Sequence, residues 1–166
     1  MKFTDNIRPL IVRHHLLHDR ERVLVALSGG ADSVALLLVL RDLRYPVEAA
    51  HCHFHLRDEE ANRDASFVEQ LCKRLDVPLH RADFNTKAVA KAQKVSLEMA
   101  ARDLRYTWFR KLLRERNIRF VAVAHHQEDN TETFFLNLLR GAGLQGLTGM
   151  SVRTTDVIRP LDRKSV

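Results

Sequence analysis

The hexapeptide at residues 28–33 constrains the fold more than any other feature of the chain. Its sequence, Ser-Gly-Gly-Ala-Asp-Ser, follows a short apolar run at 22–27 and opens a longer, largely apolar run at 33–44. A short apolar run that ends in glycines predicts a buried strand, and the longer run predicts a helix. Glycines at such a junction let backbone N–H groups approach an anion beside the helix N-terminus. The loop therefore predicts a phosphate site.

The rest of the chain continues this alternation of strands and helices. Strands are predicted at 22–27, 47–54, 78–84 and 119–124, and helices at 5–19, 33–44, 59–75, 96–116 and 131–139. The alternation indicates an α/β fold, a parallel sheet with helices on both faces. Ligands bind outside the carboxyl ends of parallel strands, so we expect segments 28–33, 53–57 and 125–129 to meet. All 166 residues are expected to form a single domain.

Composition narrows the class of protein. A hydrophobic fraction of 45% and a charged fraction of 29% exclude a disordered chain. The apolar runs are too short to cross a bilayer, and we expect a cytoplasmic protein with no membrane partner. Cys52 and Cys72 are not spaced as zinc ligands, which fits a reduced compartment. The net charge of +6 favours a polyanionic partner.

Asp32 is the unusual residue of the loop. A carboxylate repels phosphate, so an acid in this place is understandable if it holds a divalent cation. Capping of the following helix is the alternative role. The loop lacks the lysine and the spacing of a Walker A motif, and it also lacks the GxGxxG pattern of dinucleotide-binding folds.

A strand followed by SGGxDS resembles the signature of the PP-loop ATP pyrophosphatases, which have a Rossmann-like fold. The resemblance implies that ATP is cleaved between its α- and β-phosphates, that a substrate is adenylated, and that the loop holds the leaving pyrophosphate. It implies nucleotide binding by the whole loop, namely Ser28, Gly29, Gly30, Ala31, Asp32 and Ser33.

Further motifs are similar to those of one PP-loop family, the tRNA(Ile)-lysidine synthases. They are HCHFHLR at 51–57, EMAARDLRY at 98–106, AHHQEDNTET at 124–133, RGAGLQGLTGM at 140–150 and IRPL at 158–161. The order and number of these motifs make the resemblance specific over most of the chain.

The resemblance implies a ligase that forms a carbon–nitrogen bond. ATP and Mg²⁺ are the implied cofactors, and free lysine and tRNA(Ile) with a CAU anticodon are the implied partners. The wobble cytidine is adenylated on the oxygen at C2, and lysine then displaces AMP to give lysidine. The family's C-terminal tRNA-binding domains are expected to be absent from these 166 residues. A homodimer is compatible with the sequence.

The same resemblance assigns roles to individual residues. The implied catalytic residues are Asp32, Arg105, His125 and Asp129; the implied metal ligands are Asp32 and Asp129; and His53 and Arg102 are implied at the nucleotide. An ordinary helix surface charge is the alternative for Arg102, and a structural strand-end histidine is the alternative for His125.

Three histidines at alternate positions, His51, His53 and His55, would share one face of a strand, as zinc ligands can. We do not favour zinc, because no acid or thiol is expected nearby and Cys52 faces the other way.

Two other functions stay open: a PP-loop 2-thiocytidine or 2-thiouridine synthase, and a nucleotide-binding module without turnover. A thiolating enzyme needs cysteines for sulfur transfer or an Fe–S cluster, and the two cysteines here are not so spaced.

Overall fold

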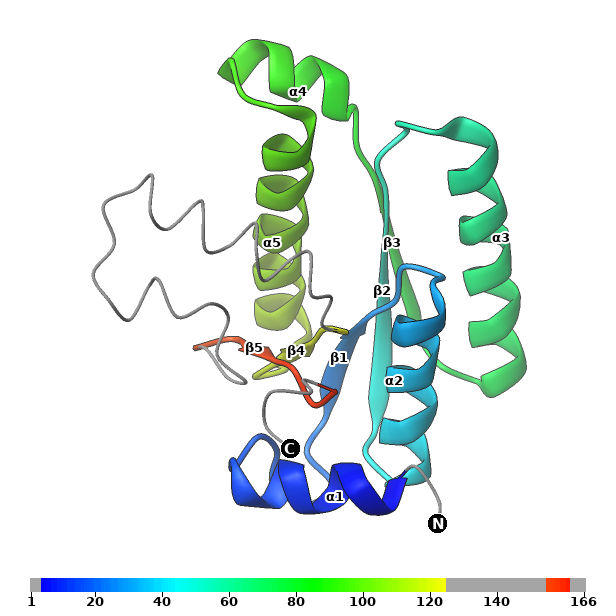
Figure 1. Ribbon diagram of the computed structural model, residues 1–166, viewed down its shortest axis with the longest axis vertical. Helices are drawn as coiled ribbons and strands as arrows, with labels where there is room; N and C mark the ends of the chain where they lie inside the picture. The colour runs from blue at the N-terminus through cyan, green and yellow to red at the C-terminus, as the bar shows by residue number, and fades with distance from the viewer. Residues whose placement is uncertain (1–3, 125–154, 162–166) are drawn as a thin grey trace.

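A fully parallel sheet forms the centre of the chain, as Figure 1 shows for the computed structural model, which describes residues 4–124 and 155–161. Its strand order is β3-β2-β1-β4-β5. The strands are β1 (Val23–Ala26), β2 (Val47–His53), β3 (Leu79–Asp83), β4 (Val121–Ala122) and β5 (Val157–Ile158). The first strand in the chain lies in the middle, so the direction of winding reverses between β1 and β4. This confirms the predicted α/β fold and places a ligand crevice at that reversal.

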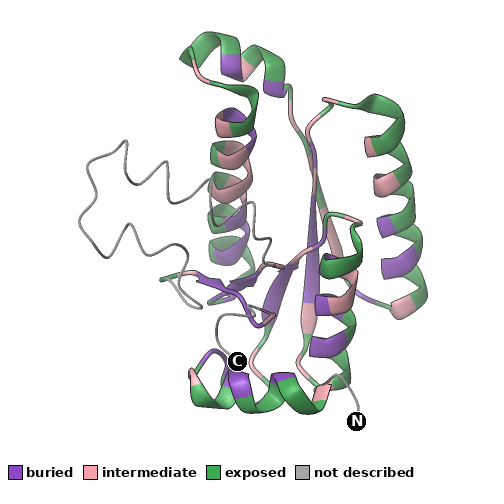
Figure 2. Cartoon of the chain, viewed as in Figure 1, coloured by how far each residue is buried: buried purple, intermediate pink, exposed green. Residues whose placement is uncertain are grey.

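Helices cover both faces of this sheet. They are α1 (Thr4–Arg13), α2 (Ala31–Asp42), α3 (Asp58–Leu75), α4 (Thr86–Gln93) and α5 (Leu97–Arg116). Side chains alternate along β1: Val23 and Val25 pack in the cluster that includes α2 and α3, whereas Leu24 packs against α5. Figure 2 shows the resulting buried strands between exposed helix faces. No helix in the described ranges is long and apolar enough to cross a membrane.

The first helix is shorter than the predicted 5–19. It ends at Arg13, after which His15 adopts a left-handed φ of 50° and Leu16 N–H donates to Ile11 O at 2.9 Å. This reverse turn folds Leu16 and Leu17 back into the core, where both are buried. Leu16 and Leu17 are therefore apolar because they pack in the core after the turn, and not because they continue the helix.

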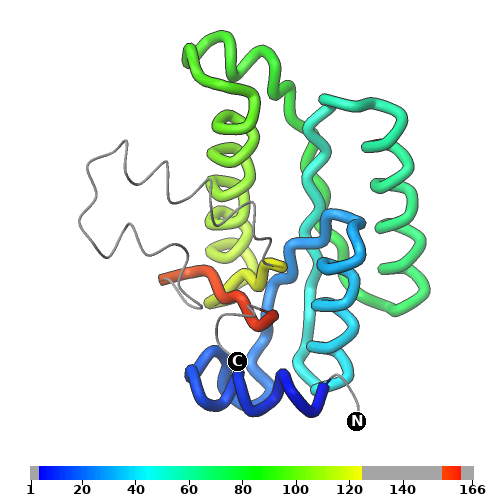
Figure 3. Tube along the Cα trace, in the orientation of Figure 1, coloured from blue at the N-terminus to red at the C-terminus, as the bar shows by residue number. Residues whose placement is uncertain are grey.

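Two elements of the described chain were not predicted. Helix α4 begins after Asn85, whose side chain accepts a hydrogen bond from Ala88 N–H at 3.3 Å. Strand β5 has two residues and pairs with β4, although the two lie far apart in the sequence (Figure 3). A strand of two residues is too short to show the alternation of apolar and polar residues by which strands are predicted from a sequence. The helix predicted at 131–139 lies outside the described residues.

A buried carboxylate joins the amino ends of the central elements. Glu48 on β2 accepts hydrogen bonds from Arg22 at 2.9 Å and from Arg116 at 3.0 Å through both of its oxygens, and it contacts His80 on β3 at 2.8 Å. The hydrogen bond from Arg116 lowers the pKa of Glu48 to about 2, against the opposing effect of burial. The charge thus fastens the end of α5 to the sheet.

We expect Glu48→Gln to lower the free energy of unfolding at neutral pH by about 2 kcal/mol, because charge-assisted hydrogen bonds are lost. The lowered pKa means that this contribution is complete above the ordinary carboxyl pKa and is lost as the pH falls through about 2. The difference between wild type and variant in urea unfolding should therefore shrink between about pH 4.5 and 2.

Glu69→Gln is the matched control, because Glu69 pairs with Arg81 while about half exposed at 51%. Its cost should stay below about 1 kcal/mol. Equal costs for the two substitutions would contradict the role given to Glu48.

Candidate active site

A cavity of about 550 Å³ opens at the carboxyl ends of β1, β2 and β4, on the face covered by α5. This size suits a nucleotide-sized ligand. Residues from five separate stretches of the chain line it: Ser28, Gly30, Asp32 and Ser33 after β1; Cys52, Phe54 and Leu56 at the end of β2; Leu97, Glu98, Arg102, Arg105 and Tyr106 on α5; Val123 and Ala124 after β4; and Arg159 after β5.

The predicted phosphate loop lines the cavity where the chain leaves β1. Gly29 has a φ of +99°, which lets the chain turn sharply into α2. The loop is tied internally, because Gly30 N–H donates to Ser28 Oγ at 3.2 Å and Ser33 Oγ–H donates to Gly30 O at 2.9 Å. The N-cap of α2 is Gly30, so no side chain caps the first turn. The positive end of the helix dipole is therefore presented to a ligand.

Asp32 lies in the first turn of α2 and lines the cavity. Its side chain is not the N-cap, so the capping role considered above does not describe its position. An exposed carboxylate beside the Ser28 and Ser33 hydroxyls gives this end of the cavity a set of oxygen ligands. Such donors fit a hard divalent cation.

Two arginines of α5 line the same cavity as the loop. Ser96 caps the helix by accepting from Met99 N–H at 3.1 Å, and the three-residue spacing sets Arg102 and Arg105 on one face. The Arg105 guanidinium lies 5.2 Å from the ring centre of Phe54, which restricts its position. Both arginines line the cavity, and the role of Arg102 at the nucleotide stays a prediction.

His53 lies on the other face of the sheet and does not line the cavity. Because side chains alternate along β2, Cys52 and Phe54 turn towards the cavity and His53 turns towards α3. The residue is 1% exposed; Nε2 bonds Asn62 Oδ1 at 2.8 Å and Nδ1 accepts from His55 N–H at 3.1 Å. The structure thus does not bring His53 together with the phosphate loop, contrary to the expectation.

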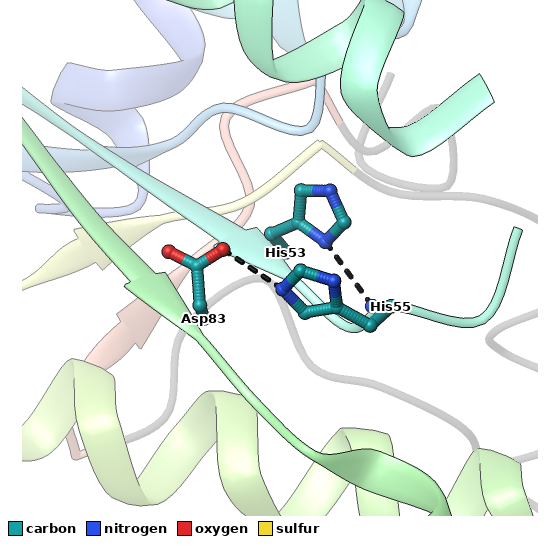
Figure 4. Close-up of side chains that lie close together, drawn as sticks. All are labelled: His53, His55 and Asp83. Atoms are coloured by element: carbon teal, nitrogen blue, oxygen red, sulfur yellow. Dashed lines mark hydrogen bonds and ion pairs between the residues drawn. The ribbon is translucent and has the colours of Figure 1, made fainter. Parts of the chain in front are cut away.

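The same face carries a cluster of possible metal ligands, in which an acid that was not expected joins two of the histidines weighed above as zinc ligands. Ligand atoms of His53, His55 and Asp83 lie within 4.8 Å of one another (Figure 4). The acid that seemed to be missing comes from β3, because the parallel register sets His53 opposite Asp83. However, Arg81 donates to both carboxylate oxygens of Asp83 at 3.0 and 3.2 Å, and His55 Nε2 lies 2.9 Å from Oδ1. The Arg81 bonds lie within β3, and the His55 contact joins β3 to the segment that follows β2.

Burial also sets the state of two other groups near the cavity. Burial raises the pKa of the Cys52 thiol to about 12, although the charge of Arg105 acts in the opposite direction. Burial lowers the pKa of His51, whose Nδ1–H donates to Leu27 O at 2.8 Å. Burial thus favours the thiol form of Cys52 and the neutral ring of His51, whose hydrogen bond holds Leu27 just after β1.

Arg159 is a site residue whose role the sequence did not reveal. It is 5% exposed and lines the cavity, held there by the pairing of β5 with β4. Its motif was recognisable, but only the fold shows that it lines the same cavity as the loop at 28–33. His125 and Asp129, the other expected catalytic residues, lie outside the described residues.

Comparisons with known proteins agree with this geometry. The PP-loop domain family matches residues 2–165. The chain is 55% identical over 163 residues to a tRNA(Ile)-lysidine synthase of Porphyromonas gingivalis, covering 97% of this chain and 36% of that protein. It is 42% identical over 164 residues to the tRNA(Ile)-lysidine synthase of Chlorobaculum tepidum, covering 96% and 48%. The chain thus spans between about a third and a half of the length of these relatives.

Solved structures share the fold. The U34-tRNA thiolase NcsA from Methanococcus maripaludis, with its [4Fe-4S] cluster, aligns with a TM-score of 0.68 at 16% identity, over 98% of this chain and 60% of that one. The NH3-dependent NAD synthetase from Campylobacter jejuni aligns with a TM-score of 0.59 at 18% identity, over 98% and 68%. At these identities the likeness concerns architecture alone.

The two loop glycines should respond differently to alanine. An alanine at position 29 would have to adopt the left-handed φ of +99°, and its Cβ would lie 3.2 Å from Asp64 Cβ. We expect Gly29→Ala to lower the free energy of unfolding by about 1–3 kcal/mol. At Gly30 the φ is −72° and the nearest atom is Ser28 Oγ at 3.5 Å, so Gly30→Ala should cost less than about 0.5 kcal/mol. Equal unfolding midpoints would contradict this account of the turn.

Proposed function

Since the chain belongs to the PP-loop domain family, we propose that its ATP-binding cavity carries out the adenylation step of a carbon–nitrogen ligase that modifies tRNA. The substrate is tRNA(Ile) with a CAU anticodon, and the second substrate is free lysine. The tRNA(Ile)-lysidine synthases that match 91–97% of this chain support this choice.

The reaction has two steps that share one centre. The oxygen at C2 of the wobble cytidine attacks the α-phosphorus of ATP, and pyrophosphate leaves. The amine of lysine then attacks C2, AMP leaves with the oxygen, and a proton is released from the amine. The products are lysidine, AMP and diphosphate.

The observation that carries this proposal is that the phosphate loop, Arg102 and Arg105 line one cavity. In the first step negative charge gathers between the α-phosphate and the leaving pyrophosphate. The loop and the N-terminus of α2 hold the pyrophosphate end, while Arg105 stabilises the charge on the reacting phosphate. Phe54 keeps that guanidinium in place.

Mg²⁺ fits the oxygen donors at the loop. Asp32 is the described residue that would hold it, and Asp129 is the second proposed ligand. When bound, Mg²⁺ neutralises charge on the phosphate oxygens. Because Asp32 lies in the first turn of α2, it would hold the metal ion close to the N-terminus of that helix.

The thiolation alternative is not favoured by the cavity. Sulfur transfer requires a reactive thiolate or a cluster held by cysteines. The sequence has two cysteines, of which Cys72 is buried in the core and Cys52 has its pKa raised to about 12. A cytoplasmic location and a homodimer remain predictions.

One assay separates the functions: ATP, lysine and tRNA(Ile) with a CAU anticodon, followed by nucleoside analysis by mass spectrometry. We expect lysidine. A thiolated base, formed with a sulfur donor present, would instead support a thiolase. ATP binding without either product would leave a nucleotide-binding module.

In that assay Asp32→Ala should abolish pyrophosphate release, because it removes the proposed metal ligand, while thermal unfolding stays close to wild type. Asp42→Ala is the control, since Asp42 lies exposed at the far end of α2. Full turnover by Asp32→Ala would refute the role of this carboxylate.

Arg105→Ala should reduce kcat by about 100-fold or more and change ATP affinity much less, as expected for charge stabilisation in the transition state. Arg114→Ala, an exposed position near the other end of α5, is the matched control. An increase in the Kd for ATP that accounts for the whole loss would show that Arg105 only binds nucleotide.

A further inference from the structure

Three lysines follow one another along α4 and its end. They are Lys87, Lys91 and Lys94, all exposed, and we call them the lysine ridge. The sequence from 84 to 97 contains no acidic residue. Within the described part of the chain, none of the three forms an ion pair. Figure 2 shows α4 as a largely exposed helix at the end of the molecule.

The ridge is fixed beside the cavity rather than carried on a loose segment. Thr86, at the start of α4, is 1% exposed and donates from Oγ1 to Phe54 O at 2.8 Å. Phe54 lines the cavity and contacts Arg105. At the other end Lys94 precedes Leu97, a cavity-lining residue, by three positions, a reach of at most about 11 Å.

The arrangement of charge is unfavourable for the isolated helix. Lys87 and Lys91 are four residues apart, about 6 Å along the axis on one face, so they repel each other. The acids that flank the segment do not offset this. Asp83 is already bonded to Arg81, and Glu98 lines the cavity. An external polyanion would relieve the repulsion.

We propose that the lysine ridge binds the phosphate backbone of the tRNA next to the nucleotide that reacts in the cavity. This inference rests on the proposed function for the identity of the RNA. It adds a contact surface outside the cavity, where phosphates on one side of the reacting nucleotide would meet the three ammonium groups. Such contacts position a nucleic acid without reading its bases.

The other face of α4 argues against a membrane surface as the partner. An interfacial helix needs a large apolar face. In α4 the side chains between the lysines are mostly alanine, and the buried Ala90 is turned inward while α4 packs on α5. The exposed large apolar residues of the described chain include none from α4.

The test compares two triple variants of the 166-residue chain. The ridge variant is Lys87→Gln, Lys91→Gln and Lys94→Gln. The control variant is Arg44→Gln, Lys73→Gln and Arg74→Gln, which removes the same charge at the opposite edge of the sheet, where α2 and α3 end. Binding of tRNA(Ile) is measured by fluorescence anisotropy between about 50 and 200 mM salt.

We expect the salt slope of the ridge variant to be smaller than wild type by about 2 to 3, at about 0.7–0.9 for each lost phosphate contact. ATP affinity should be unchanged, and the control variant should keep the wild-type slope. A ridge variant with the wild-type slope would overturn the proposal. So would an equal loss in both variants, which would reflect net charge alone, or a ridge-dependent binding to phosphatidylserine vesicles with no effect on RNA.

The lysidine assay keeps this proposal separate from the proposed function. Lysidine formation with no effect of the ridge variant on tRNA affinity would reject the ridge and keep the function. Ridge-dependent tRNA binding without adenylation of cytidine would reject the function and keep the ridge as an RNA-binding surface.

Discussion

The central, parallel position of β1 is the constraint on which the site depends. Parallel pairing on both sides of β1 directs the carboxyl ends of β2, β1 and β4 to one edge, and the reversal of winding opens the crevice there. The loop that leaves β1 must turn within two glycines to start α2 on this edge. At the opposite edge the Glu48 carboxylate joins β2, β3 and α5, so the frame is fastened away from the chemistry.

The two faces of β2 have different surroundings, because one lines the cavity and the other packs towards α3. The face towards α5 carries Cys52 and Phe54 and meets two arginines, which suits a ligand rich in phosphate. The face towards α3 carries His51, whose Nδ1 bonds Leu27 O, and His53, whose two ring nitrogens both form hydrogen bonds to the protein. A strand with histidines at alternate positions therefore need not be a metal site, even where a carboxylate lies opposite.

Local patterns predicted the strand, loop and helix around residues 28–33, because glycines and apolar runs act over short distances. They predicted Arg102 and Arg105 on one helix face for the same reason. They did not predict β5, which depends on pairing with a strand far away in the sequence, or Asp83 beside His53, which depends on the register of β2 with β3. His53 was placed by resemblance alone, and the two-residue period of its own strand turns it from the cavity.

The shortness of the β4–β5 ladder has a consequence for how the cavity holds together. Only two residue pairs of the described chain join these strands, with backbone bonds from Val121 N–H to Asp156 O at 2.9 Å and from Val123 N–H to Ile158 O at 3.0 Å. A local opening of this edge would release Arg159 while β1, β2 and β3 stay paired. The Arg159 guanidinium is thus held by a short ladder at the edge of the described sheet. A ligand that contacts Arg159 would stabilise the paired edge, so ligand binding and pairing of β5 with β4 would be coupled.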